Sequence, residues 1–186
     1  MRVISGTARG LKLNTPTNND IRPTTDRVKE SMFNIISSQV YDSVVLDLFS
    51  GSGALGIECI SRGAKEAYFC DKSRESVKVL KSNIDKTRFD KKSHVMNEDY
   101  KSAVKKLASK GMKFDLIFVD PPYYEGLFED VMKTIDDYGI LDDDGTVVVE
   151  HDADIEMKDI GDLYIYKEKK YGITMLTFYG LEEDNE

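Results

Sequence analysis

The sequence predicts an α/β domain in which helices cover both faces of a mostly parallel β-sheet. From residue 41 onward, short apolar runs alternate with amphipathic segments of about 10 to 15 residues, the pattern of successive βαβ crossovers. The length of 186 residues suits one domain of ordinary size. The sequence has no internal repeat or low-complexity tract that would indicate another architecture. Together these observations favour a Rossmann-like fold.

Residues 1–40 precede the alternating pattern and are expected to form an extension, a β-hairpin followed by a helix. The extended stretches "RVISG" and "LKLNTP" are separated by the glycine-containing "TARG", as in a hairpin. Thr24 or Thr25 can cap the helix that follows. Apolar residues at helical spacing indicate this helix: Val28, Met32, Phe33, Ile35 and Ile36. Residues 41–186 form the core, and the two parts make one compact unit.

The core is expected to contain a seven-stranded sheet. Five buried strands are predicted at "SVVLDLF", "KEAYFC", "KSHVM", "KFDLIFVD" and "GTVVVEH". Helices between them are predicted at "GALGIECISRG", "SRESVKVLKSNIDKT", "DYKSAVKKLASKG" and "LFEDVMKTIDDYG". The tail "DLYIYKEKKYGITMLTFYG" should add two strands as a β-hairpin that turns near Gly172. In such a sheet, ligands bind beyond the carboxyl ends of the strands, where the strand order switches.

The charge of the chain is unevenly distributed. The net charge is −8, which argues against general affinity for nucleic acids. Residues 1–35, however, carry six basic and three acidic side chains, a balance of +3. Residues 136–162 carry eleven acidic side chains and one lysine, a balance of −10. A basic front end on an acidic body is compatible with local contact to a polyanion, although a merely solvated surface would have the same composition.

Composition also restricts the compartment and the cofactor class. No apolar run reaches the roughly 20 residues of a membrane span, and the first residues lack the apolar segment of a signal peptide. We therefore expect a cytoplasmic protein that does not contact a membrane. Cys59 and Cys70 lack metal-ligand spacing and are expected to be buried, reduced thiols. His94 and His151 have no partner pattern, so we assign them no catalytic role and expect no metal.

A glycine-rich loop follows the first core strand in "LDLFSGSGALG". Gly51, Gly53 and Gly56 match G-x-G-x-x-G, which permits a tight turn and close approach of a ligand to a helix N-terminus. Asp71 lies 20 residues after Gly51 and can accept hydrogen bonds from a ribose. This fingerprint also fits a nicotinamide-dependent oxidoreductase, so the loop alone leaves both classes open.

A buried carboxylate before this loop favours a cationic ligand. Asp47 lies in the strand four residues before Gly51, and its burial without a partner would be costly. S-adenosylmethionine carries an ammonium and a sulfonium, whereas a dinucleotide carries two phosphates. In this interpretation Asp47 binds the amino end of the cofactor, Gly51 and Gly53 lie against it, and Asp71 binds its ribose. Asp99 could accept from the adenine amine beside Tyr100, although Asp99 is equally suited to cap a helix.

The fourth core strand ends in "VDPPYYEG", an arrangement of hydrogen-bond acceptors. An exocyclic amine of a nucleobase is a poor nucleophile because its lone pair is delocalised into the ring. The carboxylate of Asp120 and the carbonyl of Pro121 can each accept one N–H of such an amine and stabilise positive charge as it attacks. Pro122 keeps the turn rigid and adds no donor, and Tyr123 can stack on the base. An ordinary strand-ending turn is the structural alternative.

The ordered segments "RVISGTARGLKL", "RPTTDRVKESMFNI", "LDLFSGSGALGIECISRGA", "FDLIFVDPPY" and "KYGITMLTFY" resemble the small-subunit rRNA methyltransferase D family, bacterial 16S rRNA guanine-N2 methyltransferases. The similarity covers nearly the whole chain, and "RPTTDRVKESMFNI" is its most specific part. It implies an S-adenosylmethionine-dependent methyltransferase fold. It also implies methyl transfer to one guanine of 16S rRNA, in assembled or nearly assembled small ribosomal subunits.

The resemblance also implies roles for individual residues. Asp120, Pro121, Pro122 and Tyr123 match its catalytic motif, while Asp47, Gly51, Gly53, Asp71 and Asp99 fall at its cofactor positions. Asp71 stands where the family leads us to expect glutamate, so its reach to the ribose is shorter. Contact with RNA is assigned to the basic N-terminal part, where the candidates are Arg2, Arg9, Lys12, Arg22 and Arg27. The resemblance and the short connection into the first helix also place residues 22–24 near the catalytic motif.

Two alternatives stay open at the level of sequence. A DNA adenine-N6 or other amino-group methyltransferase is allowed by "DPPY", although the chain has no evident separate target-recognition domain. A nicotinamide-dinucleotide-binding oxidoreductase is allowed by the glycine loop, although Asp47 and "DPPY" count against it. We expect the protein to be a monomer.

Overall fold

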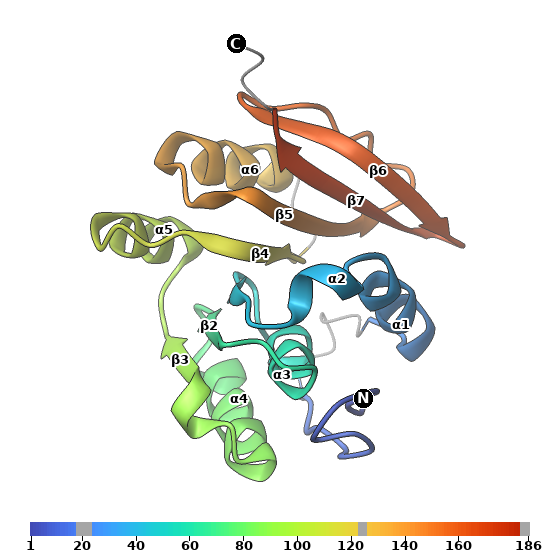
Figure 1. The fold of residues 1–186 in the computed structure, drawn as a ribbon, viewed down its shortest axis with the longest axis vertical. Helices are drawn as coiled ribbons and strands as arrows, with labels where there is room; N and C mark the ends of the chain where they lie inside the picture. Colours follow the sequence, from blue (N-terminus) through green and yellow to red (C-terminus); the bar gives the residue numbers. More distant parts are fainter. Residues whose placement is uncertain (18–23, 123–125, 183–186) are drawn as a thin grey trace.

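The computed structural model describes residues 1–17, 24–122 and 126–182, and it contains a seven-stranded sheet with helices on both faces (Figure 1). The strand order is β3-β2-β1-β4-β5-β7-β6. Strands β1 to β5 pair in parallel, whereas β7 is antiparallel to both β5 and β6. The strands are β1 (Val44–Asp47), β2 (Glu66–Cys70), β3 (Ser93–Met96), β4 (Phe114–Val119), β5 (Leu141–Asp152), β6 (Leu163–Tyr171) and β7 (Thr174–Leu181). The predicted Rossmann-like sheet with its closing hairpin is confirmed.

The predicted helices are present, and two short helical segments accompany them. The helices are α1 (Asp26–Ile35), α2 (Ser37–Val40), α3 (Ala54–Ser61), α4 (Arg74–Thr87), α5 (Tyr100–Ser109) and α6 (Leu127–Tyr138), with a 3₁₀ turn η1 (Asp90–Lys92). The single turns α2 and η1 were not predicted, because segments this short carry no helical periodicity. Thr25, one of the two predicted caps, accepts a hydrogen bond from the amide of Val28 at the start of α1.

Alternate residues of the central strands pack into two hydrophobic clusters. Val45 and Phe118 belong to a cluster with side chains of α1, α3 and α4. Leu46 and Ile117 belong to a second cluster with side chains of α5 and α6. Because successive side chains of a strand point to opposite faces, the two clusters lie on opposite faces of the sheet. The N-terminal extension therefore shares the core on the α3 and α4 face.

The strand β5 begins earlier than predicted. Leu141 already pairs with Phe114 of β4, and the register then shifts before Leu116 pairs with Thr146. The three aspartates between these pairs are exposed. The sequence prediction placed the strand start at Gly145 because a run of aspartates disfavours a strand. An irregularity in the register accommodates these residues at the surface while the buried Leu141 keeps its pairing.

The N-terminal segment folds back on itself as predicted. Its pairing, however, is limited to an isolated antiparallel bridge between Arg2 and Lys12, and the described residues 1–17 form no extended strand. Backbone amides fix the segment to α3. The amides of Ile4 and Ser5 donate to the two carboxylate oxygens of Glu58, at 2.9 and 3.0 Å. Gly6 has a φ of +85°, and a Cβ there would lie 1.7 Å from the carbonyl oxygen of Ser61. Only glycine permits this close approach.

Glu58 is the centre of a buried charge network. Its carboxylate forms ion pairs with Lys29 of α1 at 3.1 Å and with Arg62 at 2.9 Å. The side chains of Lys29 and Glu58 are 0% exposed, and the Lys29 ammonium also donates to the carbonyl of Arg2. The guanidinium of Arg62 lies 4.6 Å from the ring centre of Phe33. Lys29, counted above among the basic residues of the front end, is thus neutralised inside the protein.

We predict that Glu58→Ala destabilises the protein by about 3–5 kcal/mol, because it leaves the ammonium of Lys29 buried without its carboxylate. The loss should appear as a lower free energy of unfolding in urea at neutral pH. Amide hydrogen exchange at Ile4 and Ser5 should accelerate in the same variant, since both amides lose their acceptor.

Lys101→Ala is the control for this experiment. It removes the ion pair between Lys101 and Asp130, whose side chains are 58% and 46% exposed, and should cost less than about 1 kcal/mol. Equal destabilisation by the two substitutions would contradict a central role for Glu58.

Candidate functional site

The site is built where the strand order switches, between β1 and β4. The chain leaves β1 toward α3 on one face of the sheet and leaves β4 toward α6 on the other. The crossovers therefore diverge at the carboxyl ends of these two strands, where open α/β sheets bind their ligands in a crevice. Asp47 ends β1 and pairs in register with Phe118 of β4, so Asp120 follows only two residues further along the neighbouring strand. The structure thus brings together the glycine loop and the acceptor motif predicted from sequence.

The glycines of the loop after β1 have different roles. Gly51 has a φ of +52°, and a Cβ on it would meet no atom within 4 Å, so its backbone faces open space. Gly53 has a φ of +82° and begins α3, and a Cβ there would lie 2.3 Å from a methyl carbon of Leu80. A Cβ on Gly56 would lie 2.4 Å from the ring of Phe69. Gly51 leaves room for a ligand, whereas Gly53 and Gly56 also permit close packing of the helix.

Asp47 is a buried carboxyl group below this loop. It is 3% exposed and accepts a hydrogen bond from the amide of Gly56 at 3.2 Å. Burial raises the pKa of Asp47 to about 7, and the charge of Asp71 contributes in the same direction. Within the described ranges Asp47 forms no ion pair. This is a carboxyl group that a nearby cation would ionise.

Asp71, after β2, is held against the glycine loop. Its two carboxylate oxygens accept from the amides of Gly51 at 2.9 Å and Ser73 at 2.8 Å. The Gly51 bond connects two loops that are 20 residues apart. Asp71 therefore lies beside the open backbone of Gly51, and hydrogen bonds fix its position directly after β2.

Asp99 and Tyr100 lie after β3, and both side chains have partners within the protein. Asp99 caps α5, accepting from the amide and the hydroxyl of Ser102 at 3.0 and 2.7 Å. These hydrogen bonds lower the pKa of Asp99. The alternative assignment of Asp99 as a helix cap is thus confirmed, and its contact with adenine stays a prediction. The hydroxyl of Tyr100 donates to Asp130, and its ring lies 5.6 Å from that of Phe49.

The acceptor motif follows β4. Asp120 is half-buried, Pro121 is buried and Pro122 is exposed. Burial raises the pKa of Asp120 well above its usual range, and the charges of Glu150 and Asp47 raise it further. Three carboxyl groups thus influence one another at this edge of the sheet. The remaining member of the predicted motif, Tyr123, lies outside the described residues.

The sequence analysis missed one residue of the candidate site, Glu150, and did not predict its contact with Thr24. Glu150 lies in β5 one position after Val149, which pairs with Val119 of β4. The hydroxyl of Thr24 donates to Glu150 at 2.6 Å, although the two residues are 126 positions apart. The signal for Glu150 was an acidic residue in an otherwise apolar strand. Thr24 was expected both as a possible helix cap and near the site. Thr25 is the cap of α1, and the hydrogen bond to Glu150 agrees with the expected location of Thr24.

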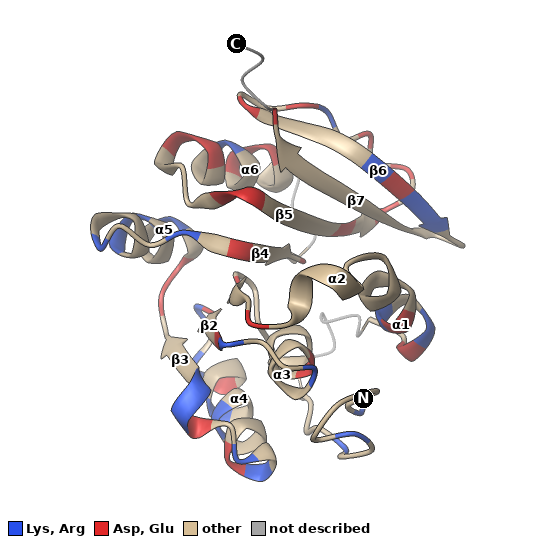
Figure 2. Cartoon of the chain, viewed as in Figure 1, with Lys and Arg blue, Asp and Glu red and all other residues tan. Residues whose placement is uncertain are grey.

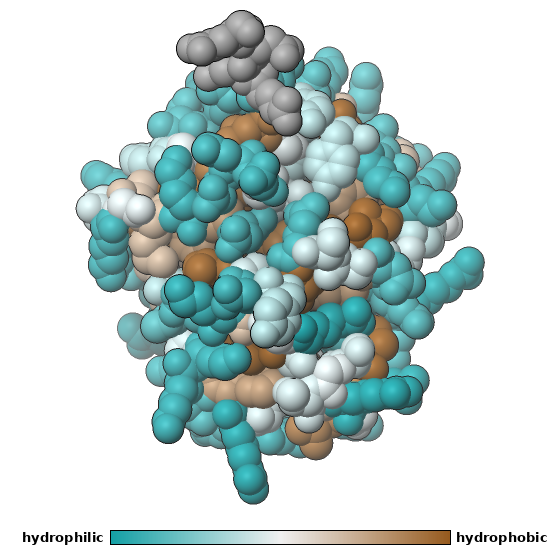
Figure 3. All heavy atoms as spheres, in the orientation of Figure 1, coloured by the Kyte–Doolittle hydropathy of each residue, from teal (hydrophilic) through white to brown (hydrophobic). Residues whose placement is uncertain are grey.

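The predicted RNA-contacting residues lie on the surface of the N-terminal hairpin and α1. Arg2, Arg9, Lys12 and Arg27 are exposed, and Arg22 lies outside the described residues. The guanidinium of Arg2 pairs with Asp26 at 3.2 Å. Figure 2 shows Lys and Arg on the hairpin and on α4, while Asp and Glu gather on α6 and at the start of β5. The face drawn in Figure 3 is mostly hydrophilic, with small apolar areas between charged side chains.

The remaining candidates for chemistry have structural partners. His151 is buried and bonds to Thr177, and His94 bonds to Glu66 while its ring stacks on Tyr68. Both cysteines are buried, free thiols, as predicted. Within the described residues, no cluster of three or more His, Cys, Asp and Glu side chains could hold a metal ion. No helix in the same ranges is long and apolar enough to cross a membrane.

Comparison with known proteins places the chain among methyltransferases. The family model described as "Conserved hypothetical protein 95" matches residues 1–180. The chain is 39% identical over 180 residues to the Bacillus subtilis protein named "Putative rRNA methyltransferase YlbH", covering 96% of this chain and 98% of that protein. It is 34% identical over 187 residues to "Ribosomal RNA small subunit methyltransferase D" of Escherichia coli, covering 100% and 92%. The solved structure titled "Putative methyltransferase yhhF from Escherichia coli" superposes with a TM-score of 0.86 at 34% identity, over 98% of each chain.

The pKa of Asp47 predicts a pH-dependent stability. The folded protein holds this proton up to about pH 7, whereas the unfolded chain releases it near pH 4. Between these values the folded state binds more protons, so stability should fall as the pH rises, by on the order of 2–4 kcal/mol. Urea unfolding of the ligand-free protein from pH 5 to pH 8 measures this slope.

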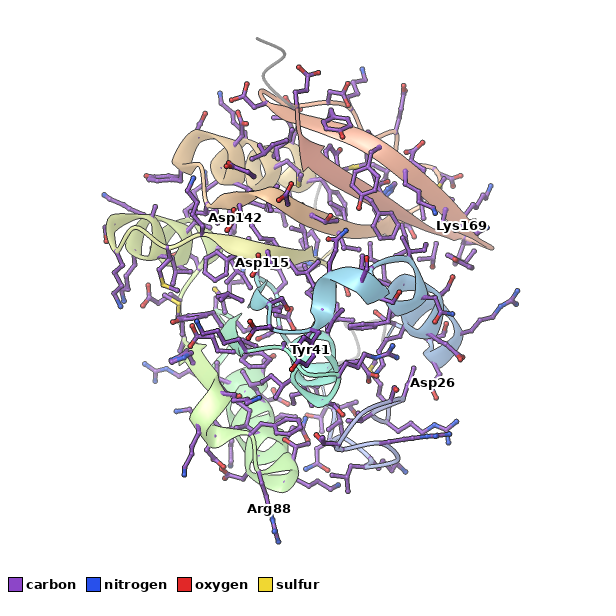
Figure 4. The ribbon with its side chains drawn as sticks, in the orientation of Figure 1. Asp26, Tyr41, Arg88, Asp115, Asp142 and Lys169 are labelled. Carbon is purple, nitrogen blue, oxygen red and sulfur yellow. The ribbon has the colours of Figure 1, made fainter. Side chains whose placement is uncertain are left out.

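Asp47→Asn should reduce the slope between pH 5 and pH 8, leaving the part that comes from the raised pKa of Asp120, while keeping an acceptor for the Gly56 amide. Asp142→Asn, at an exposed position of β5 (Figure 4), is the control and should leave the slope unchanged. A wild-type slope in Asp47→Asn would show that Asp47 does not hold the proton.

Proposed function

The chain belongs to the ribosomal RNA small subunit methyltransferase D family, and we propose that it transfers a methyl group from S-adenosylmethionine to the exocyclic N2 amine of one guanine in 16S rRNA, within the small ribosomal subunit. The observation that carries this proposal is the juxtaposition of Asp120 and Pro121 with the glycine loop across the β1 and β4 switch point. One side of the crevice offers acceptors for an amine. The other offers a carboxyl group and open backbone for a cationic nucleoside.

The residues around the loop fit S-adenosylmethionine. The open space beside Gly51 admits a nucleoside against the backbone, and the carboxylate of Asp71 lies next to it for the ribose hydroxyls. Asp47 supplies negative charge toward the amino end, since a cation offsets the cost of ionising a buried carboxyl group. When bound, the cofactor supplies an electrophilic methyl group on a positively charged sulfur. Asp99 and Tyr100 are the candidates for its adenine.

The acceptors after β4 prepare the target amine. The carboxylate of Asp120 and the carbonyl of Pro121 accept its two N–H groups and hold the lone pair toward the methyl group. As the nitrogen–carbon bond forms and the sulfur–carbon bond breaks, positive charge develops on the amine. The positive charge of the bound cofactor favours ionisation of Asp120 despite its raised pKa, and the carboxylate then stabilises the charge on the amine. The surplus proton then leaves the nitrogen for Asp120 or for water. Pro121 and Pro122 hold the turn rigid, so the acceptors are placed before the base arrives.

The charge distribution supports RNA contact on the side of the hairpin. Residues 1–17 carry three basic and no acidic side chains, and residues 74–92 carry seven basic and three acidic ones. The two segments touch, because the amide of Asn14 donates to Asn83 at 2.8 Å and the ammonium of Lys86 donates to the carbonyl of Lys12. Together they hold a balance of +7 on a chain whose net charge is −8. Arg88 projects from the end of α4 into solvent (Figure 4).

Two lysines on the opposite face form ion pairs with acidic neighbours. Within the described residues, none of the Lys and Arg side chains of α4 forms an ion pair, whereas Lys101 and Lys106 of α5 pair with Asp130 and Glu98. The surface of the hairpin and α4 is therefore better suited to the phosphate backbone of RNA than that of α5.

Family membership separates one of the two alternative functions from the proposed one, and the substrate separates the other. Family membership decides for methyl transfer and against the nicotinamide-dependent oxidoreductase. A DNA or other amino-group methyltransferase would share the acceptors after β4, and it is separated from the proposed function by its substrate.

The proposed activity is tested with labelled S-adenosylmethionine and small subunits that lack the modification, with bare 16S rRNA and DNA assayed alongside. We predict N2-methylguanosine on the subunits. Asp120→Ala should reduce turnover by about 10²–10³-fold, since it removes a charge-stabilising acceptor, while the Kd for S-adenosylmethionine changes little. Normal turnover in this variant would refute the role of Asp120, and label on adenine or on DNA would refute the substrate.

If the hairpin contacts RNA phosphates, the affinity for small subunits should depend on salt concentration. Arg9→Ala combined with Lys12→Ala should lower kcat/KM on small subunits and reduce the slope of log affinity against log salt by about one per lost phosphate contact. The control combines Lys105→Ala in α5 with Lys110→Ala directly after α5, and both lysines are exposed. A larger loss in the control pair would place the RNA on the other face.

A further inference from the structure

Glu150 lies beside Asp120 at the carboxyl edge of the sheet. Val119 of β4 and Val149 of β5 are partners in a parallel pair, so the residues that follow them emerge side by side. Both carboxyl groups are half-buried. After burial, the charge of Glu150 is the largest influence that raises the pKa of Asp120. The two side chains are therefore close enough for one base to contact both.

The N-terminal extension sets the orientation of Glu150. Thr24 is 7% exposed, immediately precedes the capping residue of α1, and donates through its hydroxyl to Oε2 of Glu150 at 2.6 Å. A carboxylate offers about four acceptor positions, so this bond orients the group and still allows it to accept further hydrogen bonds. The carboxylate is thus positioned by a partly buried contact within the protein.

Two neighbouring acceptors match the edge of guanine. Guanine presents its N1–H and its N2 amine side by side as donors, whereas N1 of adenine and N3 of cytosine are acceptors next to their amines. We propose that Glu150 accepts the N1–H of the target guanine while Asp120 and Pro121 hold the N2 amine, which makes Glu150 a specificity-determining residue. This inference rests on the proposed methyl transfer to guanine N2 and deepens it.

The contact also assists the reaction without taking part in a bond change. The N1–H bond stays intact, and the only bonds that change are those of the transferred methyl group and of the proton lost from N2. Methylation places positive charge on the guanine, and an ionised carboxylate at N1–H stabilises that charge. An adenine in the same position would set its N1 lone pair against this carboxylate and be rejected.

The experiment compares two enzymes on two bases. The target nucleotide is first identified with the wild-type enzyme. Small subunits are then reconstituted with either guanine or 2-aminopurine at that nucleotide. 2-Aminopurine keeps the exocyclic amine but has no N1–H. The variant is Glu150→Gln, whose amide oxygen can still accept from Thr24 and whose NH₂ can donate to N1. Asp142→Asn, at an exposed position of the same strand, is the matched control.

We expect the wild-type enzyme to prefer guanine by about 10²–10⁴-fold in kcat/KM, as sites built around one substrate N–H do. In Glu150→Gln the activity on guanine should fall strongly while activity on 2-aminopurine is kept or rises, so that the preference collapses. The absence of O6 in 2-aminopurine affects both enzymes and cancels in this comparison. The Kd for S-adenosylmethionine and the behaviour of Asp142→Asn should match the wild type.

Two results would overturn the inference. Wild-type activity of Glu150→Gln on guanine would show that Glu150 does not contact the base. An equal loss on both bases would show that Glu150 acts only on the structure of the site. Failure of the wild-type enzyme to form N2-methylguanosine would instead refute the proposed function, and this inference with it, before any variant is compared.

Discussion

The parallel pairing of β1 with β4 is the constraint on which the site depends. These strands are far apart in sequence but adjacent in the sheet, and their crossovers leave toward opposite faces. Any residue just after either strand therefore lies at the crevice between the diverging connections. Asp47, the glycine loop and Asp120 come together for this reason alone. The hydrophobic residues of the two strands, packed into the clusters on both faces, fix the pairing.

The electrostatics of the crevice are unfavourable in the absence of ligand. Burial raises the pKa of Asp47 in β1 and of Asp120 after β4. The charges of Asp47 and of Glu150 in β5 raise the pKa of Asp120 further. The sheet and its hydrophobic core are stable enough to hold these buried carboxyl groups in place. A cationic cofactor and a base that presents donors would reverse these costs.

The N-terminal extension is tied to the core at two places with different consequences. At one end, the buried carboxylate of Glu58 holds the hairpin and α1 through Lys29 and the amides of Ile4 and Ser5. At the other end, Thr24 contacts Glu150 inside the crevice. The hairpin, which carries basic side chains, is thus fixed relative to the reacting groups. A chain with a net charge of −8 can in this way present a local basic surface at a defined distance from its site.

The sequence by itself determined the architecture and the residues of the glycine loop and the acceptor motif, because strand and helix periodicity and the glycine and proline patterns are local properties. It also identified Asp47 as a buried carboxyl group, since an acidic residue in an apolar strand is visible in one dimension. Only the tertiary structure decided which side chains lie close enough to form hydrogen bonds, ion pairs or charge interactions. Glu150 joins Asp120 through strand pairing, Thr24 reaches Glu150 across 126 positions, and Lys29 is withdrawn from the surface by Glu58. The hydrogen bonds from the hydroxyl and amide of Ser102 show that Asp99 caps α5, while its contact with adenine stays a prediction. These outcomes depend on register, crossover direction and burial, which arise only when distant segments pack together.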